Sequence, residues 1–194
     1  IWGCNKWYII QKYLDRISEL DVKEKDIRLK QMTPEEIVIK MSKSKEVRHE
    51  KDLSVLDGNA SDNTIVKGLR IESLYFKYLT EKIGRDYEIH KNVKIGQYGY
   101  DIVAYSRKDN MDILYEIKYC NSIVLPSMLK RTCQRMCEAE AEYETYTHRN
   151  KRSILVIVSN NEAIREMKGQ RLVEDVKEKY QIDIEFVEEK SLHH

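Results

Sequence analysis

Two carboxylic acids and a lysine lie close together near the middle of the chain, on either side of an expected turn. Asp101 lies in the apolar stretch 99–105, and Glu116 and Lys118 lie in the apolar stretch 111–119, with the polar residues 106–110 between the two stretches. This pattern predicts two antiparallel strands joined by a tight turn. A turn centred between residues 108 and 109 places Asp101 directly opposite Glu116. A shift of one residue in the pairing would move the two acids to different faces.

These residue types suit a site for a hard metal ion. Side chains alternate between the two faces of a strand, so Lys118 shares a face with both acids. Adjacent buried carboxylates need a compensating cation, and Mg²⁺ prefers oxygen ligands, commonly one or two carboxylates together with a substrate phosphate. We expect Asp101, Glu116 and the carbonyl oxygen of Ile117 to bind Mg²⁺, and Lys118 to act on a water molecule or a phosphate. The competing interpretation is a surface strand with ordinary ion pairs.

The composition excludes some classes of protein and leaves others open. The 194 residues carry a net charge of +1, so nucleic-acid binding would require a local basic patch. No apolar run approaches the roughly 18 residues of a membrane span. The four cysteines form no CxxC pair, which favours a reducing cytoplasm. Cys133 and Cys137 are one helical turn apart, and we expect buried free thiols there in preference to a metal site.

The N-terminal third of the chain predicts a helical appendage over residues 1–60. Apolar residues recur at helical spacing over about 5–20, and Thr33 to Glu36 has the pattern of a helix start. The basic run 40–51 is interpreted as a solvated linker, with phosphate contact as the alternative. The loop 57–63 is the expected boundary to a domain spanning 61–190. Residues 191–194 are interpreted as a tag remnant outside the fold, and the first residue, Ile1, suggests a fragment whose sensor or regulatory domain is missing.

The remaining elements follow from the periodicity of the apolar residues. A helix is expected over 63–83, followed by strands over 88–95 and in the hairpin, a helix over 127–146, a strand over 153–159, a helix over 162–180 and a strand over 182–187. The apolar stripe of the first of these helices comprises Ile65, Leu69, Phe76, Leu79 and Ile83. Glu72 lies within that stripe and therefore needs a strong partner, either a basic side chain or the metal site. The 127–146 helix presents four polar side chains that are either phosphate contacts or a solvated face: Lys130, Arg131, Gln134 and Arg135.

This order of elements, with Asp101 in the second strand and Glu116-Ile117-Lys118 in the third, resembles the PD-(D/E)xK superfamily of restriction-endonuclease-like nucleases. The resemblance implies an α/β fold with a central mixed sheet flanked by helices. It also implies that Asp101 and Glu116 are metal ligands, Lys118 is the catalytic lysine and Glu72 is an accessory acid. Tyr100 stands where the motif has proline, and Glu138 follows Gln134 where the RecB-like QxxxY signature has tyrosine. These departures favour an Mrr-like or Holliday-junction-resolvase-like relative.

The expected function is therefore Mg²⁺-dependent hydrolysis of phosphodiester bonds, with Mn²⁺ as a substitute metal and DNA as the expected substrate. The chain would suit the effector domain of a larger defence or restriction protein, and a homodimer or higher oligomer would supply the two sites that cutting a duplex often requires. The alternative is a catalytically inactive nucleic-acid-binding or assembly module with the same fold. The sequence leaves the cleavage specificity and the activator open.

Overall fold

The computed structural model describes residues 58–120, 124 and 126–193, together with residues 32, 33, 36 and 39 of the preceding segment. The expected helix over 5–20 and the basic run 40–51 lie outside these residues. At the predicted helix start, the Thr33 N–H donates to Glu36 Oε2 over 3.0 Å and the Glu36 N–H donates to Thr33 Oγ1 over 3.3 Å. This reciprocal pair is a capping box, so the predicted helix start is confirmed at Thr33.

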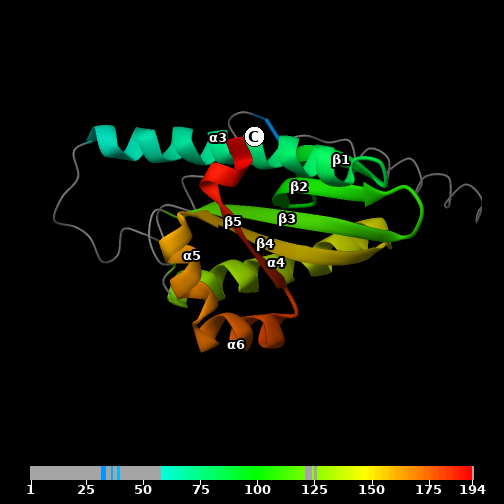
Figure 1. Cartoon of the computed structure of the whole chain (residues 1–194). Helices are drawn as coiled ribbons and strands as arrows, with labels where there is room; N and C mark the ends of the chain where they lie inside the picture. The colour runs from blue at the N-terminus through cyan, green and yellow to red at the C-terminus, as the bar shows by residue number, and fades with distance from the viewer. Residues whose placement is uncertain are drawn as a thin grey trace, which may run out of the picture.

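A five-stranded mixed sheet forms the centre of the molecule (Figure 1). Its strands follow one another in space in the order of the chain: β1 (Tyr87–Ile95), β2 (Tyr98–Ser106), β3 (Met111–Tyr119), β4 (Asn150–Ser159) and β5 (Asp183–Glu188). The pairs β1–β2 and β2–β3 are antiparallel, whereas β3–β4 and β4–β5 are parallel. The continuous burial of β4 from Ser153 to Ser159 fits a central parallel strand covered on both faces.

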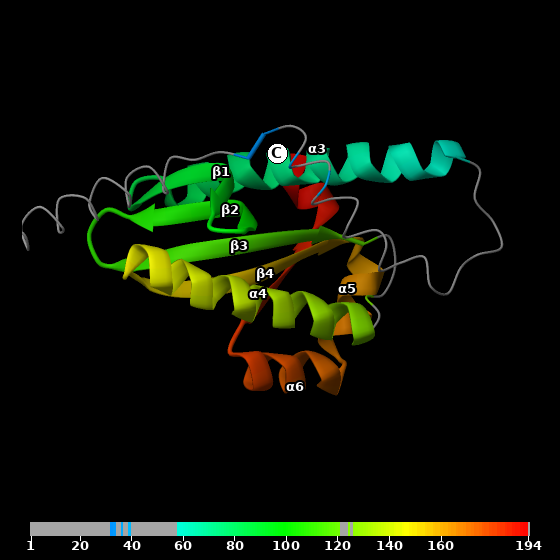
Figure 2. The ribbon, with the colours of Figure 1, turned by 180° about the vertical axis from the view of Figure 1, so that it is seen from behind.

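Helices cover both faces of this sheet, which confirms the expected α/β class (Figures 1 and 2). One face carries α3 (Gly58–Ile83) and the short 3₁₀ helix η1 (Glu189–His193). The other face carries α4 (Pro126–Thr147), α5 (Asn161–Lys168) and α6 (Arg171–Tyr180). Among the helices of the described ranges, none has the length and apolar character that a membrane crossing needs.

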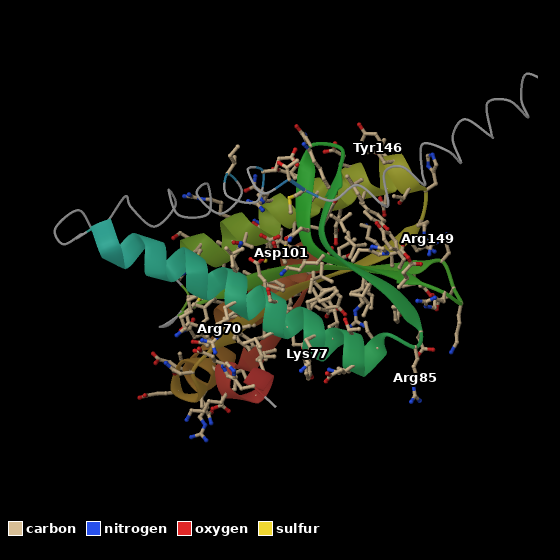
Figure 3. The ribbon with its side chains drawn as sticks, turned by 90° about the horizontal axis from the view of Figure 1, so that it is seen from above. Arg70, Lys77, Arg85, Asp101, Tyr146 and Arg149 are labelled. Carbon is tan, nitrogen blue, oxygen red and sulfur yellow. The ribbon has the colours of Figure 1, made fainter. Side chains whose placement is uncertain are left out.

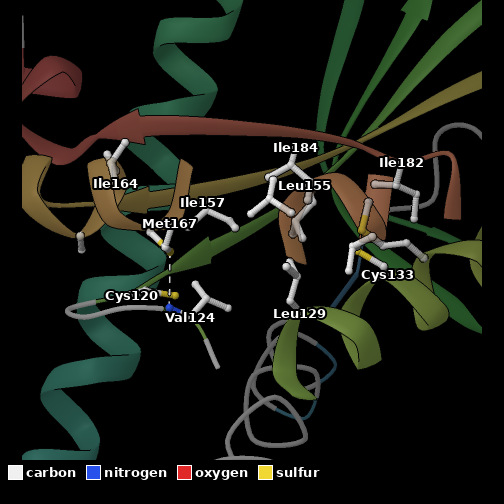
Figure 4. Packing of buried hydrophobic residues seen from close by; sticks show 14 residues of the cluster. Cys120, Val124, Leu129, Cys133, Leu155, Ile157, Ile164, Met167, Ile182 and Ile184 are labelled. Atoms are coloured by element: carbon white, nitrogen blue, oxygen red, sulfur yellow. Dashed lines mark hydrogen bonds between the residues drawn. The ribbon is translucent and has the colours of Figure 1, made fainter. Parts of the chain in front are cut away.

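The core on the α4 side is made of aliphatic and sulfur-containing side chains from β4, β5 and the three helices (Figure 4). Within it, the Val124 N–H lies 3.4 Å from Met167 Sδ, which ties the segment before α4 to α5. Cys133 is a buried free thiol, as predicted, whereas Cys137, also predicted to be buried, is only half-buried; Cys120 is buried as well. Burial raises the pKa of the Cys133 thiol to about 12, so this side chain packs as a small apolar group.

Helix α3 differs from its prediction at its start and in its buried stripe. It begins at Gly58, so the expected boundary loop over 57–63 is largely helical. Turn-forming residues cost a helix only about 0.5–1 kcal/mol each, and no proline prevents the helix from extending. The side chains packed most deeply are Ile71, Tyr75 and Leu79, whereas Leu69 and Phe76 are half-buried. Where the helix docks on the sheet decides which of several apolar stripes is buried.

One further prediction near the C-terminus is wrong. The single helix expected over 162–180 is two helices, because the chain leaves the helical conformation after Gly169 and Gln170 is extended (φ −84°, ψ 125°). Glycine is a poor helix former, and the break lets α5 and α6 lie against different parts of the sheet face. Residues 191–193 belong to η1, and Leu192, at 5% exposure, packs into the α3-side core. The sequence pattern of this tail did not indicate that contact.

Candidate active site

The register of the β2–β3 hairpin is the one the sequence predicts. Ile102 lies opposite Tyr115, Val103 opposite Leu114 and Ala104 opposite Ile113. Asp101 and Glu116 are the next residues along in the same register. Both are buried, with 4% and 6% of their surfaces exposed.

Alternation along the two strands determines which face the acids occupy. The predicted apolar set packs against α3 in one core cluster: Ile102, Ala104, Ile113, Tyr115 and Ile117. The residues between them point to the face that α4 covers, where Val103 and Leu114 pack against Ala139 and Tyr143 of that helix. Asp101 and Glu116 therefore share the α4 face of the sheet, and Figure 3 shows Asp101 in the middle of the molecule.

Asp101 is held against the neighbouring strand by its own carboxylate. Its Oδ2 accepts a hydrogen bond of 2.7 Å from the backbone N–H of Ile117. This bond lies just beyond the last paired residues, Ile102 and Tyr115. Here the Asp101 side chain, and not a backbone carbonyl of β2, accepts the hydrogen bond from β3. The carboxylate consequently has a fixed position beside the Glu116–Lys118 segment.

Glu116 accepts hydrogen bonds from two cations. Its Oε1 lies 2.8 Å from Lys118 Nζ and 3.2 Å from Arg135 Nη2. Lys118 is on the same strand and on the same face, as predicted, and its side chain is 18% exposed. Arg135 comes from α4 and is 39% exposed, so it reaches from solvent into the site. The structure thus places two cations in contact with Glu116, and Asp101 is bonded to the next residue along β3, Ile117.

The other predicted contacts to nucleic acid lie along the same helix. Lys130, Arg131 and Gln134 are exposed on α4, and Gln134 Nε2 lies 3.3 Å from Glu138 Oε1. Arg135 is the member of this group that bonds to Glu116. A role for the exposed three in binding phosphate stays a prediction.

Glu72 is buried, as its place on the apolar face of α3 predicts, with 7% of its surface exposed. Its neighbours Ile71 and Tyr75 pack on the α3 side of the sheet, whereas Asp101 and Glu116 face α4. Within the residues that the structure describes, no three His, Cys, Asp or Glu side chains are grouped so that they could hold a metal ion. The carboxylates at the candidate site are therefore Asp101 and Glu116, and the accessory role of Glu72 stays a prediction.

Two cavities adjoin this cluster. The smaller one, about 20 Å³, lies beside Glu116 and Arg135 and is also bordered by Tyr98 and Tyr100. The larger one, about 320 Å³, is lined by Tyr98, Arg135, Lys94 and Glu36. The sequence interpretation did not assign Lys94, Tyr98 or Glu36 to the site. One signal could have indicated this turn: Tyr98 lies between Gly96 and Gly99, just before Asp101.

Comparisons with known proteins add one distant likeness of fold. No protein-family profile matches the chain, and no curated protein matches it. A crystal structure of a repair endonuclease from Pyrococcus abyssi aligns with 70% of this chain at 15% sequence identity and a TM-score of 0.36. The alignment covers 49% of that structure, so the chain spans about half its length. The assignment of function therefore depends on the geometry of the site.

Proposed function

We propose that this chain is a metal-dependent nuclease that hydrolyses phosphodiester bonds in DNA. The observation that carries the proposal is the arrangement at the end of the β2–β3 pairing. Asp101 and Glu116 are buried on one face of adjacent strands, and Lys118 Nζ lies 2.8 Å from Glu116 Oε1. Two carboxylates and an amine in this arrangement suit hydrolysis of a phosphodiester bond by an activated water molecule.

The donor set fits Mg²⁺, with Mn²⁺ as a substitute. Asp101 and Glu116 offer carboxylate oxygens, and the carbonyl of Ile117, between the Glu116 and Lys118 positions, offers a third oxygen. Mg²⁺ is commonly held by one or two carboxylates and keeps several water ligands, so two protein carboxylates are sufficient. When bound, the ion would lower the pKa of a bound water molecule and polarise the phosphate.

The residues around the acids have separate roles in this proposal. The Ile117 N–H holds the Asp101 carboxylate in place over 2.7 Å, so this group needs little rearrangement before reaction. Lys118, mostly buried, orients the attacking water and offsets the negative charge that builds on the phosphate. Arg135 is longer and more exposed, and its guanidinium can exchange Glu116 for a phosphate oxygen of the substrate.

A second candidate function is a nucleic-acid-binding or assembly module without turnover. One observation favours it: Lys118 and Arg135 both bond to Oε1 of Glu116, so two positive charges already compensate this carboxylate. In such a module these ion pairs would be permanent and would stabilise the fold. Metal-dependent cleavage distinguishes the two functions.

The deciding experiment incubates the protein with plasmid and single-stranded DNA in the presence of Mg²⁺, Mn²⁺ or EDTA. We expect cleavage with either metal, none with EDTA, and none by Glu116→Gln with Mg²⁺. The matched control is Glu178→Gln, which removes an exposed acid of α6 and should cleave like the parent protein. Binding without metal-dependent cleavage would support the second candidate, and full activity of Glu116→Gln would refute the mechanism.

The proposed nuclease function also bears on the oligomeric state of the chain and on its control by another domain. A nuclease that cuts both strands of a duplex would act as a homodimer or higher oligomer, and light scattering with and without DNA would measure this. If the chain is the effector domain of a larger cytoplasmic defence or restriction protein, a sensor domain would control it. Comparing the specific activity of the chain with that of a longer protein would test this relation.

A further inference from the structure

The larger cavity beside the candidate site is partly open to solvent and is lined by three separate parts of the chain. It lies between residues 32, 36 and 39, the β1–β2 turn and the first half of α4, and its volume is about 320 Å³. This is within the range of roughly 300–1,000 Å³ typical of sites for small molecules. Its lining includes Met32, Glu36, Lys94, Gln97, Tyr98 and Arg135.

Specific contacts fix the N-terminal wall of this cavity. The Met32 N–H donates to the Asn92 carbonyl oxygen over 2.6 Å, and Glu36 forms an ion pair with Lys94. The Met32 side chain lies on Gly99, where an added Cβ would be 2.3 Å from Met32 Sδ. A side chain at position 99 would therefore displace this wall, and the glycine allows the close approach.

The cavity is continuous in its lining with the candidate active site. Tyr98, Gly99 and Arg135 line both this cavity and the small one that borders Glu116. Arg135 Nη2 is 3.2 Å from Glu116 Oε1, so an arginine that lines the cavity also contacts one of the two acids. A ligand with a phosphate at Glu116 could therefore place a neighbouring group of the same molecule in this cavity.

The charges that line the cavity are balanced. Lys94 is paired with Glu36, and Arg135 is paired with Glu116. A phosphate would have to displace one of these carboxylates, whereas an uncharged polar ring would not. Tyr98 contributes a half-buried aromatic ring, and Gln97 offers an amide group, so the wall suits a flat heteroaromatic ligand with hydrogen-bonding edges.

We propose that this cavity receives one unpaired nucleobase from the strand whose phosphate lies at Asp101 and Glu116, with Tyr98 as its stacking platform. The placement of the phosphate rests on the proposed nuclease function. A paired base is held within the double helix and cannot enter a cavity of this size, so the substrate class is single-stranded or locally unpaired nucleic acid. Stacking on an aromatic side chain tolerates any base, so the cavity selects for strand state and not for sequence.

The test measures binding in EDTA, so that it does not depend on cleavage. A fluorescein-labelled single-stranded oligodeoxynucleotide and the same strand annealed to its complement are titrated with the protein by fluorescence anisotropy. We expect tighter binding of the single strand, and about tenfold weaker binding of it by Tyr98→Leu. Tyr98→Phe keeps the ring and gives up the 3.3 Å hydrogen bond to Glu138 Oε2, so it should bind like the parent protein.

The matched control is Tyr146→Ala, because Tyr146 is a 44% exposed tyrosine of α4 that does not line the cavity. Unchanged binding by Tyr98→Leu, or equal binding of duplex and single strand, would overturn the proposal. Should Tyr98→Leu fail to fold, the parent protein titrated with adenosine gives the answer, since amide chemical shifts should change over residues 94–99 and a lack of change there overturns the proposal. A protein that binds as expected but never cleaves with Mg²⁺ would refute the nuclease function and leave the base cavity supported.

Discussion

Strand β3 carries a buried acid near each end, and the two acids are held in different ways. Asp112 is near the hairpin turn and is 0% exposed, whereas Glu116 is near the other end and is 6% exposed. They are four residues apart, so both face α4. Their difference lies in which groups bond to them.

Asp112 is enclosed by partners that leave little freedom. Arg149 donates to Oδ2 through Nε over 2.5 Å and to Oδ1 through Nη2 over 2.7 Å. Tyr143 donates its hydroxyl to Oδ2 over 2.6 Å, and the Ser106 N–H donates to Oδ1 over 2.9 Å. A bidentate arginine with further donors to both oxygens is the arrangement that makes a buried charge tolerable. Figure 3 shows Arg149 beside this end of the sheet.

Glu116, by contrast, accepts hydrogen bonds at Oε1 from two cations. Both come from flexible side chains, Lys118 and the partly exposed Arg135, and cavities adjoin the group. An acid enclosed like Asp112 stabilises the fold, and an acid bonded like Glu116 can exchange partners. Burial alone therefore does not single out a candidate functional acid; the adjoining cavity and the flexible cations are what favour Glu116 over Asp112 as the candidate.

The largest expected difference between Glu116 and Asp112 is in catalysis, where Glu116 should act together with Asp101 and Asp112 should not act. Asp101→Asn and Glu116→Gln should each lower the rate of DNA cleavage with Mg²⁺ by at least about 10²-fold, because each removes a charge that the reaction requires. Gel assays of plasmid nicking would measure the rate, and the thermal midpoint should stay within a few degrees of the parent value. Loss of folding in both variants would mean that Asp101 and Glu116 stabilise the β2–β3 pair, as Asp112 does at the turn end.

Stability should show the opposite pattern. Asp112→Ala leaves Arg149 buried without its partner, and breaking a buried pair in this way costs about 3–5 kcal/mol of unfolding free energy. Urea denaturation followed by circular dichroism would measure this loss. The fraction that remains folded should cleave DNA at the parent rate, and a specific loss of cleavage would place Asp112 in the active site.

Alkaline pH should lower the free energy of unfolding of the whole domain, whichever acid of β3 is present. Burial raises the pKa of Tyr100 and of Tyr115 above the ordinary value of 10.0, and it raises the pKa of Cys133 to about 12. Above about pH 9 the unfolded chain releases these protons while the folded chain keeps them, so stability is full below that pH and falls as the pH rises. We expect a loss of about 2 kcal/mol by pH 10 in urea titrations. Glu116→Gln should lose the same amount, whereas a smaller loss in that variant would tie the effect to the site.

The smallest expected effect concerns Arg135. Arg135→Ala should raise the KM for DNA about fivefold and change the unfolding free energy by less than about 1 kcal/mol, because a partly exposed ion pair contributes little to stability. Steady-state kinetics on a labelled strand would measure KM and kcat separately. Arg131→Ala, one turn earlier and exposed, is the control and should change KM less. A change confined to kcat would give Arg135 a role in the reaction in place of substrate binding.

The sequence by itself determined the hairpin and the pairing of its acids. Apolar residues at every second position fix which face of each strand is buried, and a short polar turn fixes the register, so Asp101 and Glu116 could be placed together with Lys118. The run 153–159 likewise indicated a buried parallel strand. These features depend on residues near one another in the chain, and local periodicity encodes them directly.

Tertiary structure alone decided the partners of the buried acids. Arg135 reaches Glu116 across 19 residues and Arg149 reaches Asp112 across 37, and both contacts depend on where α4 and the start of β4 dock. Docking also selected the buried stripe of α3 and placed Glu36 against Lys94 at the edge of the larger cavity. Such contacts come from packing between whole elements. Periodicity does not encode them, because a helix with several apolar stripes can bury any one of them, depending on its rotation where it docks.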